Sequence, residues 1–140
     1  MSKIKLSNTM KFLSGKFNAI TGGHVELSLQ IDTEVVPSGG ELSANAKVRW
    51  PNKPGQIEYL QISLKGQVQR DDKWEDYVQS AEVAHDVSLL ENHEFIVPIV
   101  IKIPSDAVLT EDGGNWSLYA RAFIDKQFDP REEVGFHVVG

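Results

Sequence analysis

Apolar and polar residues alternate along most of the chain after residue 24, which is the pattern of strands that bury one face and expose the other. In the first such run, Val25–Ile31, apolar side chains alternate with Glu, Ser and Gln. Glycine, proline or acidic residues, which favour turns, separate the runs. The later runs cover Leu42–Trp50, Ile57–Gln69, Trp74–Ser80, Val83–Leu89, Phe95–Ile103, Trp116–Ile124 and Val134–Val139. About eight short strands at this spacing predict an all-β, antiparallel two-sheet sandwich.

Individual residues within and between these runs predict local features. Pro37–Gly40 has the composition of a tight turn and joins the first two runs into a hairpin. Gly66 occupies a position whose neighbours in the same phase are apolar, which indicates a bulge or a crowded crossing. Pro98 lacks an N–H and therefore predicts a sheet edge or a bulge. His85 lies in the apolar phase of its run and predicts a half-buried imidazole.

The core-facing phase of the runs predicts which side chains build the core. These are Val25, Leu27, Leu29, Ile31, Leu60, Ile62, Leu64, Phe95, Val97, Ile99, Ile101, Trp116, Leu118 and Ala120.

Residues 1–23 have a different pattern and form a basic leader ahead of a sandwich domain at 24–140. Their apolar residues recur every three or four positions, which on a helix makes one narrow stripe. The stripe consists of Leu6, Met10, Leu13, Phe17 and Ile20. A basic amphipathic helix can lie on an anionic membrane, whereas a first strand, or a helix docked on the domain or on a second subunit, is the alternative that we favour. The interrupting lysines exclude a secretory signal.

Composition limits the classes of function. The 140 residues fit one domain, and the absence of cysteine excludes thiol nucleophiles, zinc ribbons and disulfides and favours a reducing, cytoplasmic setting. The leader holds four lysines and no acid, while the remaining chain holds ten Lys and Arg against twenty Asp and Glu. An acidic domain repels phosphate backbones, so we expect no nucleic-acid binding.

No catalytic motif is present, and we expect neither an enzyme nor a bound cofactor. The four histidines are scattered without metal-ligand spacing. The acids around Asp129 fit a solvated turn better than a calcium site, because basic residues lie among them. The alternative is a small metal-dependent binding or hydrolytic module that draws His and carboxylates from separate loops, for example Asp125, Asp129 and His137.

Three segments in order resemble the N-terminal domain of the arrestin family. They are the hairpin sequence Val25–Leu42 with its Pro-Ser-Gly-Gly turn, the strand Ile57–Gln67 that ends in Leu-Lys-Gly, and Phe95–Asp125 with its proline, glycine-rich loop and aromatic strand. Asp125–Glu133 and the leader are similar to the bacterial and archaeal sporulation-control branch of that family. The resemblance implies an arrestin-like, or more broadly immunoglobulin-like, sandwich that acts as a non-enzymatic adaptor or scaffold for other proteins. Arrestins have two such sandwiches, so no residue of their interdomain phosphate sensor is carried over.

The candidate interaction surfaces are the leader stripe and the segment Trp74–Val78. Trp74 and Tyr77 stand among acidic residues beside a turn, which is typical of an exposed edge strand. Edge strands are templates for pairing, so we expect contacts with other proteins, including a second copy of this chain through the edge or the leader.

Deleting residues 1–20 tests the leader. Burying each apolar side chain of the stripe is worth about 1.5–3 kcal/mol, so something should cover it. We expect the deletion to lower the oligomer mass in light scattering if a second copy covers the stripe, and to lower co-sedimentation with liposomes if a membrane covers it. If the stripe packs on the domain itself, we expect the truncated protein to lose its fold. If the truncated protein equals the full chain in all three measurements, the stripe has no role.

Overall fold

A computed structural model describes residues 25–50, 55–90, 93–124 and 129–140. The leader candidates Leu6, Met10, Leu13, Phe17 and Ile20 lie outside these residues, as does Asp125.

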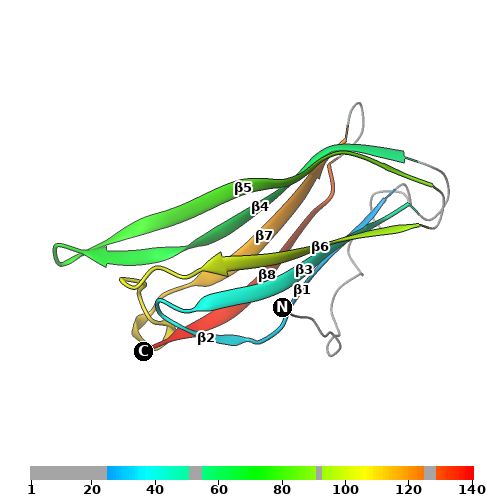
Figure 1. Cartoon of the computed structure of the whole chain (residues 1–140). Helices are drawn as coiled ribbons and strands as arrows, with labels where there is room; N and C mark the ends of the chain where they lie inside the picture. The colour runs from blue at the N-terminus through cyan, green and yellow to red at the C-terminus, as the bar shows by residue number, and fades with distance from the viewer. Residues whose placement is uncertain (1–24, 51–54, 91–92, 125–128) are drawn as a thin grey trace.

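Within these residues, eight strands form two sheets, and the predicted two-sheet sandwich is confirmed (Figure 1). The strands are β1 Glu26–Ile31, β2 Val35–Pro37, β3 Glu41–Arg49, β4 Gly55–Arg70, β5 Lys73–Leu89, β6 Glu94–Lys102, β7 Trp116–Phe123 and β8 Arg131–Val139. One sheet has the order β1-β3-β6, and the other has the order β2-β8-β7-β4-β5. The pairs are antiparallel except for β2 with β8, which is parallel.

The first predicted hairpin is present, with an insertion that the alternation did not show. β1 and β3 pair antiparallel, and the turn at residues 37–40 is closed by the N–H of Gly40, which donates to the carbonyl of Pro37 at 2.9 Å. Gly39 has a φ of 77°, a conformation that glycine adopts without steric cost. Just before this turn, the chain leaves the sheet of β1, and the short strand β2 pairs with β8 in the five-stranded sheet. The chain therefore links the two layers at this point.

The core lies between the sheets. Of the predicted core, all are buried except Ile31, Phe95 and Ile101, which are partly buried and pack against it. Trp50, Leu42, Val48 and Phe136 are further buried members.

Gly66 marks a crowded crossing, as predicted. A Cβ atom on Gly66 would lie 2.2 Å from the indole ring of Trp116, so only glycine leaves room for this fully buried ring. The Trp116 Nε1–H donates to the carbonyl of Val108 at 2.8 Å, which satisfies the buried donor. The ring thereby fixes β4, β7 and the loop after β6 against one another.

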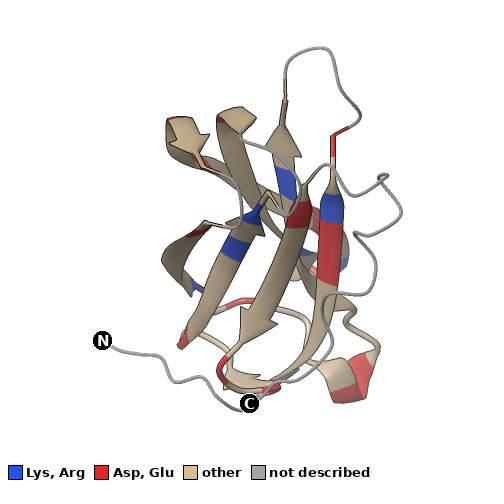
Figure 2. Cartoon of the chain, turned by 90° about the vertical axis from the view of Figure 1, so that its right-hand side faces the viewer, with Lys and Arg blue, Asp and Glu red and all other residues tan. Residues whose placement is uncertain are grey.

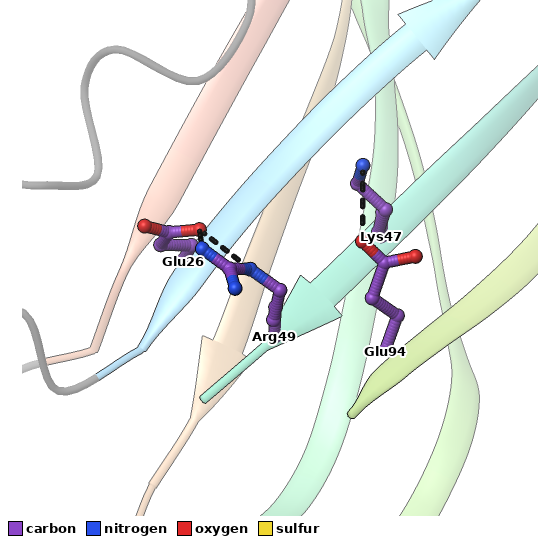
Figure 3. A network of polar contacts seen from close by, with 4 residues as sticks. All are labelled: Glu26, Lys47, Arg49 and Glu94. Carbon is purple, nitrogen blue, oxygen red and sulfur yellow. Dashed lines mark hydrogen bonds and ion pairs between the residues drawn. The ribbon is translucent and has the colours of Figure 1, made fainter. Parts of the chain in front are cut away.

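The exposed face of the three-stranded sheet carries cross-strand ion pairs (Figure 3). Arg49 Nη2 lies 3.0 Å from Glu26 Oε1, and Lys47 Nζ lies 3.5 Å from Glu94 Oε2. They connect β1 to β3 and β3 to β6. All four side chains are about a third or more exposed, so each pair is worth at most about 1 kcal/mol. Bands of both charge signs lie on neighbouring strands in Figure 2.

Gly66→Ala tests the crossing. The added Cβ would force the Trp116 ring or the backbone to move, and we expect a loss of about 1–3 kcal/mol in the free energy of unfolding. Urea denaturation measures it. Gly135→Ala is the matched control, because its Cβ would make an ordinary 3.7 Å contact with the carbonyl oxygen of Trp116. Equal stabilities of the two variants would contradict the packing account.

Candidate interaction surface

The candidate surface is the hairpin of β4 and β5, whose turn lies far from the other strands in Figure 1. Its two turn residues, Asp71 and Asp72, have φ values of 51° and 64°. Two successive positive φ values characterise the turn type that matches the twist of a hairpin, and Asp tolerates this conformation. The sequence therefore folds back over two residues and starts β5 at Lys73.

The base of the turn is tied to the loop that follows β6. Arg70 Nε donates to Asp106 Oδ2 at 3.1 Å, and Arg70 Nη1 lies 3.7 Å from Glu75 Oε1. The hydrogen bond and charge of Asp106, more than Glu75, raise the pKa of Arg70 above its usual value. Because the Arg70 side chain is 54% exposed, this contact positions the turn more than it stabilises the fold.

The same loop also hydrogen-bonds to β4 near the turn, on the side of β4 that faces away from β5. The Gln69 N–H donates to the carbonyl of Asp106, and the Val108 N–H donates to the carbonyl of Gln67, both at 2.8 Å. β7 and this loop thus flank one side of β4, while β5 flanks the other. β5 itself ends the sheet, and no described strand pairs with its far side.

Trp74 and Tyr77 lie on this edge strand, on opposite faces. Trp74 is 51% exposed, and an added Cβ at Gly113 would lie 3.0 Å from its ring. Tyr77 is half-buried, with its ring centroid 6.1 Å from that of Trp116, and its hydroxyl donates to Gln79 Oε1 at 2.8 Å. The prediction of an edge strand at Trp74–Val78 is confirmed. Val78, the last residue of this candidate segment, is also exposed on the face of Trp74, although only Trp74 and Tyr77 were singled out within the segment.

The two predicted strands Trp74–Ser80 and Val83–Leu89 are one strand, β5, with an irregularity between them. Leu60 pairs with Ala84 and Gln61 with Glu82, which leaves Val83 unopposed, and Asp86 has a φ of 51°. Next to this irregularity, Ala84 packs against the core and His85 is exposed.

The prediction of a half-buried His85 is therefore wrong. His85 is exposed, its ring centroid lies 6.3 Å from that of Tyr59, and its Nε2 lies 3.4 Å from Glu82 Oε1. Apolar phase alone does not determine burial across such a shift in register.

An aromatic and cationic cluster covers part of the outer face of the five-stranded sheet. Tyr59 and Phe123 stack with their centroids 4.1 Å apart, and the guanidinium of Arg121 lies 4.1 Å from the Phe123 centroid. Nearby, Lys65 Nζ lies 4.3 Å from the centroid of Tyr119. The sequence signal for it is the second phase of Trp116–Phe123, which alternates Tyr, Arg and Phe. These side chains mainly contact one another through ring stacking and cation–π interactions, so the cluster stabilises the sheet.

Of the candidate metal ligands, Asp129 and His137 are described, and the structure does not bring these two together. Both oxygens of Asp129 are used locally: Oδ2 accepts from Arg121 at 2.9 Å, and Oδ1 accepts from the Ile124 N–H at 3.0 Å. β8 begins two residues after Asp129, and His137 lies near its far end. Because strands rise about 3.3 Å per residue, the length of β8 separates His137 from Asp129. Within residues 25–50, 55–90, 93–124 and 129–140, no three His, Asp or Glu side chains gather where they could hold a metal ion.

A shallow hollow lies at the opposite end of the hairpin from its turn. It is lined by Gly55, Gln56, Ser88, Leu89 and Leu90 and has a volume of about 390 Å³. Among the described residues that line it, none carries a carboxylate, imidazole or amine for acid–base chemistry. In the described part of the chain, no helix is long and apolar enough to cross a membrane.

No family model and no curated protein matches the sequence. Among solved structures, the chain is similar to Spo0M, the sporulation control protein from Bacillus subtilis, with a TM-score of 0.71 and 15% sequence identity. The match covers 84% of this chain and 50% of that one, so the chain spans about half the length of the protein it resembles. At this identity the likeness concerns the fold. With its two sheets and nearly all-β content, this chain has the arrestin-like sandwich fold that the sequence predicts.

Proposed function

We propose that this chain is a non-enzymatic protein-interaction adaptor that binds an extended segment of a partner along the free edge of β5. The observation that carries the proposal is the edge itself, a 17-residue strand paired on one side only within the described structure. An extended peptide can add a strand to such an edge, with main-chain hydrogen bonds for affinity and side-chain contacts for specificity.

β5 suits strand addition better than the other sheet edges. β1 and β2 have six and three residues, which limits the number of main-chain hydrogen bonds. β6 has nine residues, but Pro98 lies in its middle and offers no N–H to a partner. β5 contains no proline, and its hairpin extends past the end of β6 in Figure 1.

The outward face of β5 also supplies apolar contacts. Trp74 and Val78 are 51% and 62% exposed and lie four positions apart, hence on the same face of the strand. Large aromatic side chains contribute most of the energy at many protein interfaces. An added strand would cover Val78 and part of the Trp74 ring.

Two further features agree with the proposal, one concerning the role of the chain and the other its location. The similar protein is described as a sporulation control protein, which names a controlling role. The absence of cysteine supports placing the adaptor in the cytoplasm.

Peptides selected from a random display library on the full chain test the proposal. We expect selected peptides to bind with affinity that falls about tenfold or more for the double variant Trp74→Ala/Val78→Ala, because two exposed contacts are lost. Amide hydrogen exchange should slow in β5 on binding, because free N–H groups of the edge become paired.

Ile96→Ala/Val100→Ala is the matched control. These residues are 53% and 59% exposed and lie four positions apart on β6, an edge strand of the three-stranded sheet. We expect this variant to bind within about twofold of the unaltered chain. The proposal fails if no peptide is selected, if both variants lose equal affinity, or if protection appears in β6 and not in β5.

A further inference from the structure

We infer that the segment bound along β5 is basic, with Lys or Arg opposite Glu75, Asp76 and Glu82. This inference rests on the proposed function and specifies the chemistry of the partner. It derives from the charges along the free edge and from what each of them faces inside the sheet.

Acids dominate β5. The strand contains Glu75, Asp76, Glu82 and Asp86 against the single Lys73. Two more acids, Asp71 and Asp72, form the turn. The free edge is therefore strongly anionic along the stretch that carries Trp74 and Val78.

The neighbouring strand does not neutralise these acids by direct pairing. Opposite them, β4 presents Val68 to Glu75, Gln67 to Asp76 and Gln61 to Glu82.

Two exposed charge contacts are present at the ends of the stretch from Glu75 to Glu82. Arg70 lies 3.7 Å from Glu75, with both side chains 54% exposed, and His85 lies 3.4 Å from Glu82 and is an ion pair only when protonated. Both contacts leave carboxylate oxygens open to water and to an incoming cation.

A second copy of β5 is a poor occupant of this edge. In an antiparallel pairing of two β5 strands over their full length, eight acids would share one seam with two lysines. Like charges on facing strands are destabilising, and charge is a known protection of sheet edges against self-pairing. The same acids attract a basic strand, since facing residues of paired strands have Cβ atoms about 4.5–5.5 Å apart.

The positions of the acids set the pattern of the partner. Asp76 and Glu82 are six residues apart on the face that holds Val78, whereas Glu75 is on the other face with Tyr77. An antiparallel partner therefore has two adjacent basic residues and a third basic residue six positions from one of them. Apolar residues between them would contact Val78 and Tyr77.

Two synthetic peptides that span the nine positions facing Trp74–Glu82 test the inference by fluorescence anisotropy. One has Lys at the three positions opposite the acids, the other has Glu there, and the apolar positions are identical. We expect the full chain to bind the Lys peptide at least about tenfold more tightly, with a preference that weakens as salt rises.

The triple variant Glu75→Gln/Asp76→Asn/Glu82→Gln should reduce this preference to about twofold, because the edge acids are neutralised. Asp32→Asn/Glu34→Gln/Glu41→Gln is the matched control, since it changes net charge equally at exposed positions away from β5. It should keep the full preference. Circular dichroism checks that each variant folds.

The outcomes separate the two proposals. Equal affinity for both peptides, or equal losses in the two triple variants, would overturn the basic preference and leave edge binding intact. Failure of both peptides to bind would overturn the inference, and an empty peptide selection would overturn the proposed function with it.

Discussion

The contact between Trp116 and Gly66 is the constraint on which the hairpin depends. Trp116 begins β7, Gly66 lies in the outer half of β4, and the indole fills the space that a side chain at 66 would take. Its Nε1 also bonds the carbonyl of Val108 in the loop before β7. One ring therefore holds two strands and a loop together at the point where the hairpin leaves the sandwich.

This support explains why β5 keeps a free edge in an ordered hairpin. Isolated two-stranded hairpins are marginal in water, so a projecting hairpin needs contacts beyond its own ladder. Here the loop pairs its main chain with β4 at Gln67 and Gln69, and Arg70 bonds Asp106 beyond them. These contacts are all on the β4 side. The side of β5 that faces away from β4 is left available because the hairpin is stabilised elsewhere.

Sequence patterns predicted the sandwich, most of its core and the edge character of Trp74–Val78, because alternation with period two and turn residues are local properties. They did not predict the switch of β2 to the other sheet, which is set by parallel pairing with β8, over 90 residues away in sequence. The exposure of His85 was also missed, since it follows from a shift in register between β4 and β5 that neither strand shows alone. Gly66 is the instructive intermediate: its position predicted crowding, and only the fold shows that Trp116 is the cause.

An exposed sheet edge has to avoid pairing with copies of itself and yet remain open to its partner, and geometry alone cannot satisfy both requirements. A proline or a covering loop would block every strand equally. Charge discriminates by sign: in the proposed complex, the acids of β5 would attract a basic segment at the same positions at which they would repel another β5. Each exposed pair contributes little, about 1 kcal/mol or less, so selectivity must come from several acids acting on one seam. In the proposed complex, the spacing of Glu75, Asp76 and Glu82 over eight residues would provide this selectivity without burying any charge, and the main-chain ladder and Trp74 would supply the affinity that the charges do not.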